Sequence, residues 1–259
     1  MLRSTAGTLR RTLAPAAVAL LALATALVEA QHAPIRVIAS NGVRTFVDAV
    51  VPAFERTSGR KVALTYGTTS GLVKNIVAGE GFDVVIASAD GITQIAAAGK
   101  IAAGSRTAIG HSFVGLGVRQ GARRPAIGSA ADMKQALLEA KGVTYAGDGA
   151  SRPHIDAMFT RLGIAEAVKA KTILEQGSGR AIGRVTAGDA DLLITLVSEI
   201  LPAPGIELVG PLPPEFSSSV SFAAAVGAAA SDPPAARALV TSLVSPESTA
   251  TLRQKGLER

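Results

Sequence analysis

Short apolar runs that read as strands alternate with amphipathic stretches that read as helices from Ile35 to the end of the chain. Each run of Val, Ile, Leu or Ala leads into a turn of small or hydroxyl residues, and apolar residues at helical spacing follow the turn. Repeated strand–turn–helix units bury their apolar faces by placing helices on a largely parallel sheet. The alternation therefore predicts an α/β fold.

The predicted elements are spread over the chain without an internal repeat. Strands are predicted at 35–39, 61–66, 84–87, 113–118, 143–146, 171–174, 192–196 and 219–226. Helices are predicted at 43–57, 70–78, 91–98, 130–140, 153–162, 181–187, 233–244 and 246–255. The stretch 201–214 is rich in Pro and Gly, and we predict no strand or helix within it.

The elements divide into two groups, although no single linker separates them. The middle section reads as an α/β lobe of its own, and the last two helices need an apolar face elsewhere to pack on. We therefore predict one lobe from residues 31–116 plus 223–259 and a second lobe from residues 117–222. Two crossings would join the lobes, with a cleft where the crossings meet.

The N-terminal segment has the three parts of a secretory signal peptide. Arg3, Arg10 and Arg11 precede an apolar run over 13–28, and small residues surround a cleavage position after Ala30. The paired arginines also permit a twin-arginine signal. The run is short and Ala-rich for a membrane span, and without Cys it offers no lipid anchor. We expect an exported, periplasmic chain without stable membrane insertion; an uncleaved anchor is the alternative.

Composition excludes several classes of function. Cys and Trp are absent and aromatic residues make up 3% of the chain, which excludes disulfides, thiol catalysis and Cys-ligated metals and disfavours stacking on sugars or nucleic acids. The net charge of +6 is scattered rather than clustered, so we expect no nucleic-acid partner. No metal-binding, nucleophile-elbow or dinucleotide motif occurs, and we predict no metal and no cofactor.

Four strand-to-helix turns carry hydroxyl, amide and glycine residues, and they lie at 40–42, 68–71, 148–152 and 177–180. Ligands in open parallel sheets bind at the carboxyl ends of strands, where free N–H groups and the helix dipole favour an anion. Each turn alone also has an ordinary reading as a helix cap. Together the turns predict an anion site, and its candidate residues are Ser40, Asn41, Gly42, Thr69, Ser70, Ser151 and Ser178.

Charged candidates lie in or near the same turns. Arg152 and His154 stand at a predicted helix start, where arginine can clamp a carboxylate in a bidentate manner and histidine can bind an anion or move a proton. A solvated arginine and a structural histidine are the alternative. Arg180 is a weaker candidate because Arg184 lies one turn further on. Glu199 is a lone carboxylate expected near the cleft.

Several motifs together resemble the molybdate-binding-like family of periplasmic solute-binding proteins. The resemblance covers nearly all of the predicted mature chain and implies a two-lobe type II periplasmic binding protein fold. It also implies a small anionic ligand, a monomer, and delivery of the ligand to the membrane subunits of an ABC importer. The matching segments are 37–40, 66–72, 82–86, 149–151, 198–202 and 205–213.

The ligand is less well indicated than the family. Molybdate-binding members use serines of the first two loops and a tyrosine of the second lobe, whereas this sequence has Gly42 and Leu196 near two of those places. The hydroxyls of Thr69 and Ser70 remain, and Arg152 points to a carboxylate. We therefore predict a solute-binding protein that captures an oxyanion or a polycarboxylate.

An alternative activity comes from one branch of the same family. Segments 198–202 and 210–213 are similar to those of aconitate isomerase, a periplasmic enzyme that acts on a tricarboxylate. Such an enzyme needs a base to move an allylic proton, and no cofactor. His154 or Glu199 would then be the catalytic residue.

Overall fold

The computed structural model describes residues 33–259, so the predicted signal peptide lies outside the described residues. Residues Ile35–Arg259 form one compact unit. No helix in the described range is both long enough and apolar enough to cross a membrane.

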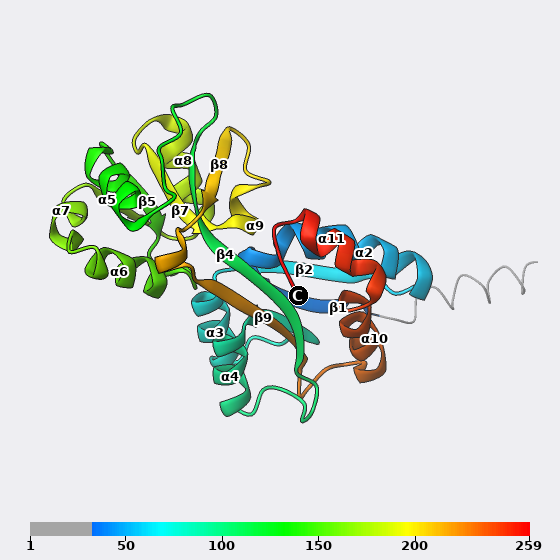
Figure 1. Ribbon diagram of the computed structural model, residues 1–259. Helices are drawn as coiled ribbons and strands as arrows, with labels where there is room; N and C mark the ends of the chain where they lie inside the picture. The colour runs from blue at the N-terminus through cyan, green and yellow to red at the C-terminus, as the bar shows by residue number, and fades with distance from the viewer. Residues whose placement is uncertain (1–32) are drawn as a thin grey trace, which may run out of the picture. The chain divides into compact units, whose positions relative to one another are not determined.

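The first part of the sheet, here called the first sheet, has a parallel centre (Figure 1). Strand β1 (Ile35–Ser40) pairs in parallel with β2 (Val62–Gly67) and β3 (Val84–Ser88). Strand β9 (Ser219–Val226) then joins β3 and the start of β4 (Thr107–Arg119), antiparallel to both.

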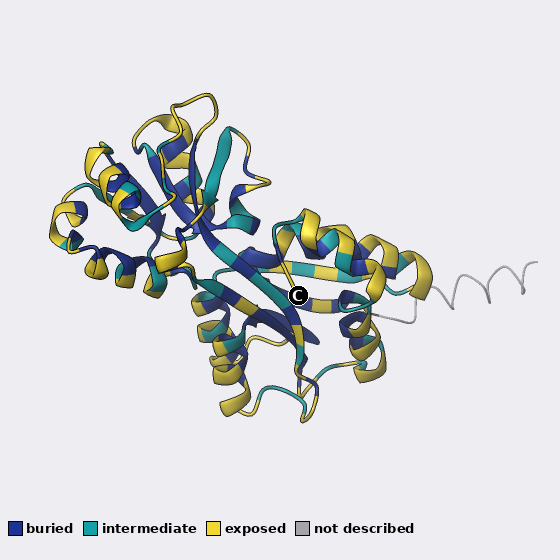
Figure 2. Cartoon of the chain, in the orientation of Figure 1, coloured by how far each residue is buried: buried dark blue, intermediate teal, exposed yellow. Residues whose placement is uncertain are grey.

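Helices cover both faces of the first sheet because its central strands are apolar on both sides. Val37 and Ala39 belong to one core cluster with Phe46, whereas Ile38 belongs to a second cluster with Ile92. Figure 2 shows these strands buried between helices whose outer faces are exposed. The covering helices are α2 (Arg44–Ser58), α3 (Thr69–Val77), α4 (Ala89–Ala97), α10 (Pro233–Leu243) and α11 (Pro246–Gln254).

The long strand β4 continues into the second part of the sheet, here called the second sheet. Residues 107–113 of β4 pair with β9, whereas residues 114–119 pair antiparallel with β7 (Leu192–Leu196) and β8 (Ile206–Pro211). Strand β5 (Val143–Ala146) pairs in parallel with β7 and with β6 (Thr172–Glu175). The associated helices are α5 (Ala130–Glu139), α6 (Arg152–Arg161), α7 (Ala165–Lys169), α8 (Ser178–Ala187) and α9 (Val197–Ile200).

The predicted α/β fold class is confirmed, but some elements differ from the sequence prediction. Strand β4 begins at Thr107 instead of 113, and β8 lies in the stretch where no element was expected. Helix α7 was also not predicted. Pairing is antiparallel wherever β4, β8 or β9 takes part. The lobe boundaries proposed from the sequence remain a prediction.

A buried carboxylate links β1 and β3 to the turn before α10. The carboxylate of Asp83 accepts hydrogen bonds from the backbone N–H of Arg36 at 2.8 Å and from its Nε at 3.2 Å. It also accepts from the backbone N–H and the hydroxyl of Ser231, at 2.8 and 3.0 Å. Burial alone would raise the pKa of Asp83, but these hydrogen bonds outweigh burial and lower the pKa from 3.8 to about 2.

Asp83 is therefore expected to make the free energy of unfolding depend on pH in the acidic range. Because its pKa is lower in the folded chain, the stabilisation is present above pH 4 and is lost as the pH falls through about 2. Asp83→Asn should lower the free energy of unfolding at pH 7 by about 2 kcal/mol. Urea unfolding at pH 7 and at pH 3 measures this. An equal loss at both pH values would contradict it.

Candidate functional site

The turns at the carboxyl ends of β1, β2, β5 and β7, together with the start of α8, surround a small inner cavity of about 20 Å³. All four turns singled out in the sequence contribute to its wall. Such a volume holds about one water molecule, so a larger ligand requires the two sheets to move apart. The lining residues are Ser40, Asn41, Gly42, Thr68, Thr69, Ala146, Gly149, Ala150, Ser151, Ser178, Thr195, Leu196 and Glu199.

Neutral hydroxyl groups dominate the polar lining of the inner cavity. Thr69 donates from Oγ1 to Oγ of Ser40 at 3.4 Å and accepts from the backbone N–H of Ser88 at 3.3 Å. Thr68 is the N-cap of α3, and its hydroxyl accepts from the N–H of Gly71 at 3.3 Å. Capping therefore explains Thr68, while Ser40 and Thr69 are buried hydroxyls facing the cavity.

The inner cavity holds one titratable side chain within the described residues, that of Glu199. The hydroxyl of Ser178 donates to its Oε1 at 2.8 Å, and the hydroxyl of Thr195 donates to its Oε2. Burial raises the pKa of Glu199 above its ordinary value, while hydrogen bonds from Thr195, Ser178 and the backbone at Leu196 act in the opposite direction. A buried carboxyl group with a raised pKa is a candidate for general acid–base chemistry.

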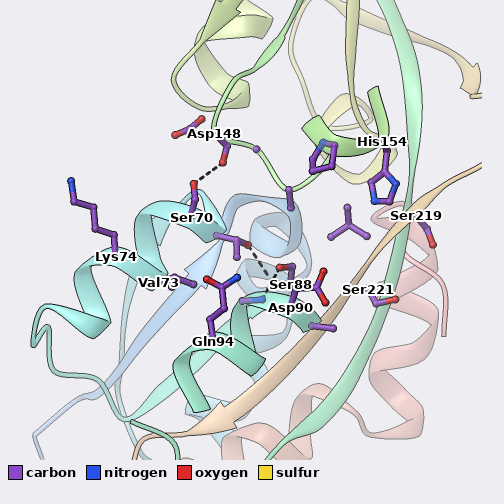
Figure 3. A pocket seen from close by; sticks show the side chains of 17 residues that line it. Ser70, Val73, Lys74, Ser88, Asp90, Gln94, Asp148, His154, Ser219 and Ser221 are labelled. Carbon is purple, nitrogen blue, oxygen red and sulfur yellow. Dashed lines mark hydrogen bonds between the residues drawn. The ribbon is translucent and has the colours of Figure 1, made fainter. Parts of the chain in front are cut away.

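A larger outer pocket of about 610 Å³ shares Thr69, Gly149 and Ala150 with the inner cavity. Ser70 and His154, two of the predicted site residues, line this pocket. Figure 3 shows His154 and Ser219 among the side chains that line it. A ligand that extends beyond the inner cavity would enter this pocket.

The two predicted arginines line neither the inner cavity nor the outer pocket. Arg152 donates from Nη1 to the carbonyl of Gly147 at 2.7 Å and from Nε to Oδ2 of Asp156 at 3.2 Å. Asp156 in turn accepts from the hydroxyl of Tyr145 at 2.8 Å. Arg152 therefore stabilises the turn after β5 in this structure. Arg180 is exposed and contributes to neither hollow.

Direct hydrogen bonds join the two sides of the inner cavity. The carboxylate of Asp148 accepts from the hydroxyl of Thr68 at 3.1 Å and from the N–H of Gly177 at 2.8 Å, and its carbonyl accepts from Ser70 at 2.8 Å (Figure 3). The hydroxyl of Ser198 donates to the carbonyl of Gly42 at 2.7 Å. These contacts hold the turns of the first sheet against those of the second.

Sequence reasoning missed three residues that matter here. Thr195 is a single hydroxyl in an otherwise apolar strand, four positions before Glu199, and that spacing was the available signal. Asp148 lies in the predicted turn at 148–152 but is not among the candidate residues. Arg44, which contacts the lining residue Asn41, lies at the start of the helix predicted at 43–57.

The sequence matches the family described as bacterial extracellular solute-binding protein over residues 35–258. The chain belongs to this family, which confirms the resemblance stated from the motifs. It is 31% identical over 249 residues to an aconitate isomerase from a Pseudomonas species, covering 93% of this chain and 94% of that protein.

Solved structures support the same fold. The periplasmic molybdate-binding protein of Azotobacter vinelandii superposes with a TM-score of 0.73 at 15% identity, over 87% of this chain and 99% of that one. A sulfate-binding protein of Mycobacterium tuberculosis gives a TM-score of 0.68 at 21% identity, over 87% and 86% of the two chains. The predicted type II periplasmic binding protein fold is thereby confirmed.

Proposed function

We propose that this protein binds an unsaturated polycarboxylate of the aconitate class between its two sheets and isomerises it by proton transfer through Glu199. The observation that carries the proposal is the Glu199 carboxyl group, which accepts hydrogen bonds from Ser178 and Thr195 among the neutral donors of the inner cavity. Identity of 31% with an aconitate isomerase over nearly the whole chain supports it.

The neutral donors and the carboxyl group suit different tasks. Hydroxyl and backbone N–H groups at the starts of α3 and α8 can hold a carboxylate without a full counter-charge. An ionised Glu199 would repel the same anion, so a site built for capture alone gains nothing from it. A group that changes its protonation state is instead suited to receive a proton from the bound molecule and to return it.

The reaction requires only movement of a proton and of a double bond. In aconitate, a methylene group lies on one side of the central carbon and the double bond lies on the other. Glu199 would take a proton from the methylene carbon, and the remaining electron pair would spread over the allylic carbons and the adjoining carboxylates. Returning a proton to the other terminal carbon moves the double bond. Both ends carry the same substituents, so the product is again aconitate, with its geometry set by the pocket.

Capture of an anion for an ABC importer is the second candidate function, and membership of an extracellular solute-binding family favours it. In this case the two sheets would close on an oxyanion or polycarboxylate in the periplasm, and the membrane subunits of the importer would receive it. Both candidates begin with the same binding step and differ in whether the ligand leaves changed.

Turnover of trans-aconitate distinguishes the two candidates. In D₂O the purified protein should convert trans-aconitate to cis-aconitate and place solvent deuterium on the methylene carbon of the product. Proton NMR follows both changes. A rise in melting temperature with trans-aconitate but no conversion would favour capture. If molybdate, sulfate, citrate and both aconitates all leave the melting temperature unchanged, neither candidate stands.

A further inference from the structure

A positive charge lies beside the inner cavity without a carboxylate partner. Arg44 donates from Nη2 to Oδ1 of Asn41, a lining residue, at 3.1 Å. Its guanidinium carbon lies 4.1 Å from the centre of the Tyr66 ring. Among residues 33–259, no carboxylate forms an ion pair with Arg44. Most N–H donors of this guanidinium therefore remain available.

Arg44 is exposed, and its contacts with Asn41 and the Tyr66 ring orient its guanidinium. The hydroxyl of Tyr66 donates to Oδ1 of Asp48 at 2.6 Å, which orients the ring. Burial and the hydrogen bond to Asp48 raise the pKa of Tyr66, so the phenol stays neutral and its ring face attracts a cation. Arg44 is also the first residue of α2, directly after the turn that carries Asn41 and Gly42.

Five other arginines in the described range have acidic partners, whereas the rest, Arg106 and Arg161 among them, form no ion pair there. Arg36 pairs with Asp83, and Arg184 with Glu175 and Asp189. Arg44 is held instead by a neutral amide and an aromatic face. The planar guanidinium matches a carboxylate in a bidentate manner, and its charge would be neutralised by such a group on a ligand.

We propose that Arg44 binds a second carboxylate of a ligand whose first carboxylate occupies the inner cavity. Arg44 thereby selects polycarboxylates over monocarboxylates and inorganic oxyanions. This proposal rests on the proposed function and names a residue that determines its specificity. It also assigns to Arg44 the role that the sequence suggested for Arg152.

The test compares Arg44→Gln, Arg44→Lys and a matched control, Arg161→Gln. Arg161 also lies over an aromatic ring, at 4.8 Å from that of Phe216, but unlike Arg44 it has no hydrogen bond to a residue that lines the inner cavity. Dissociation constants for trans-aconitate and for the monocarboxylate crotonate are measured by NMR titration. Loss of a charge-assisted hydrogen bond should weaken trans-aconitate binding by about 10–100-fold in Arg44→Gln. Crotonate binding should change by less than about twofold, since it lacks the second carboxylate.

Melting temperatures of the variants show whether the fold is intact, and Arg44→Lys should retain part of the affinity because the charge remains. Arg44→Gln could weaken the binding of crotonate and of trans-aconitate equally, or leave trans-aconitate binding unchanged. Either result would overturn the role of Arg44. In that event, continued conversion of trans-aconitate would leave the proposed function standing. Failure of the unaltered protein to bind any polycarboxylate would overturn both.

Discussion

Glu199→Gln is expected to lower kcat for trans-aconitate isomerisation by about 10²–10⁴-fold, the usual contribution of a positioned general acid–base. Glutamine has nearly the same shape and keeps hydrogen-bonding atoms opposite Ser178 and Thr195, but it cannot accept the substrate proton. Binding of trans-aconitate should persist in the variant, because the neutral donors of the inner cavity are unchanged. Turnover assays measure kcat, and NMR titration measures the affinity for trans-aconitate.

The pH profile gives an independent readout of the same role. Because burial raises the pKa of Glu199, the rising limb of kcat/KM against pH should lie above the range of an ordinary carboxyl group. Glu207→Gln is the matched control, since Glu207 is a partly exposed carboxylate on β8 paired with Arg124 at 3.2 Å. Full turnover in Glu199→Gln would move the proton transfer to another group, and His154→Gln would then be the variant to examine.

The position of the site could be predicted from the sequence because it depends on local chemistry and topology. Small and hydroxyl residues after an apolar strand mark a strand-to-helix turn, and the carboxyl ends of parallel strands lie at one edge of a sheet. Ser40, Thr69, Ser151 and Ser178 all follow this rule and line the inner cavity. Their role in holding a ligand stays a prediction.

The charges of the site could not be assigned in the same way. The partner of a long side chain depends on tertiary geometry, so nothing local distinguishes Arg152, which reaches Gly147 and Asp156, from Arg44, which reaches Asn41. The sequence indicated Glu199 as a carboxylate near the cleft. Its raised pKa, however, comes from burial that only the folded chain provides.

Two strands were misjudged for physical reasons that the structure makes clear. The first half of β4 contains Gly110 and polar residues, and the pairing with β9 shifts register there. The carbonyl of Glu258 approaches Gly110 so closely that a Cβ would lie 2.3 Å from it, so only glycine fits. Strand β8 pairs with β4 alone and ends at Pro211, a residue that edge strands tolerate.

Gly42→Ala is expected to destabilise the fold and to impair the site together. A Cβ at this position would lie 2.5 Å from Cζ of Phe222 and 2.9 Å from Cδ1 of Leu196. Phe222 is almost fully buried in the core, so its ring cannot move aside without disturbing other contacts. Overpacking of this kind costs about 1–3 kcal/mol.

The same substitution should also displace the carboxyl group of Glu199, through the backbone of the turn. The carbonyl of Gly42 accepts the hydroxyl hydrogen bond of Ser198, the residue before Glu199 on α9, so displacement of this turn displaces the carboxyl group. A misplacement of about 1 Å can lower turnover by about 10²-fold. Urea unfolding and trans-aconitate turnover test the two effects.

Gly183→Ala, on α8 with no atom within 4 Å of its Cβ position, should instead be neutral or stabilising by about 0.5–1 kcal/mol. Wild-type stability and turnover in Gly42→Ala would contradict both expectations. The turn could then accept a Cβ without a change in the free energy of unfolding, and its carbonyl would not position Glu199.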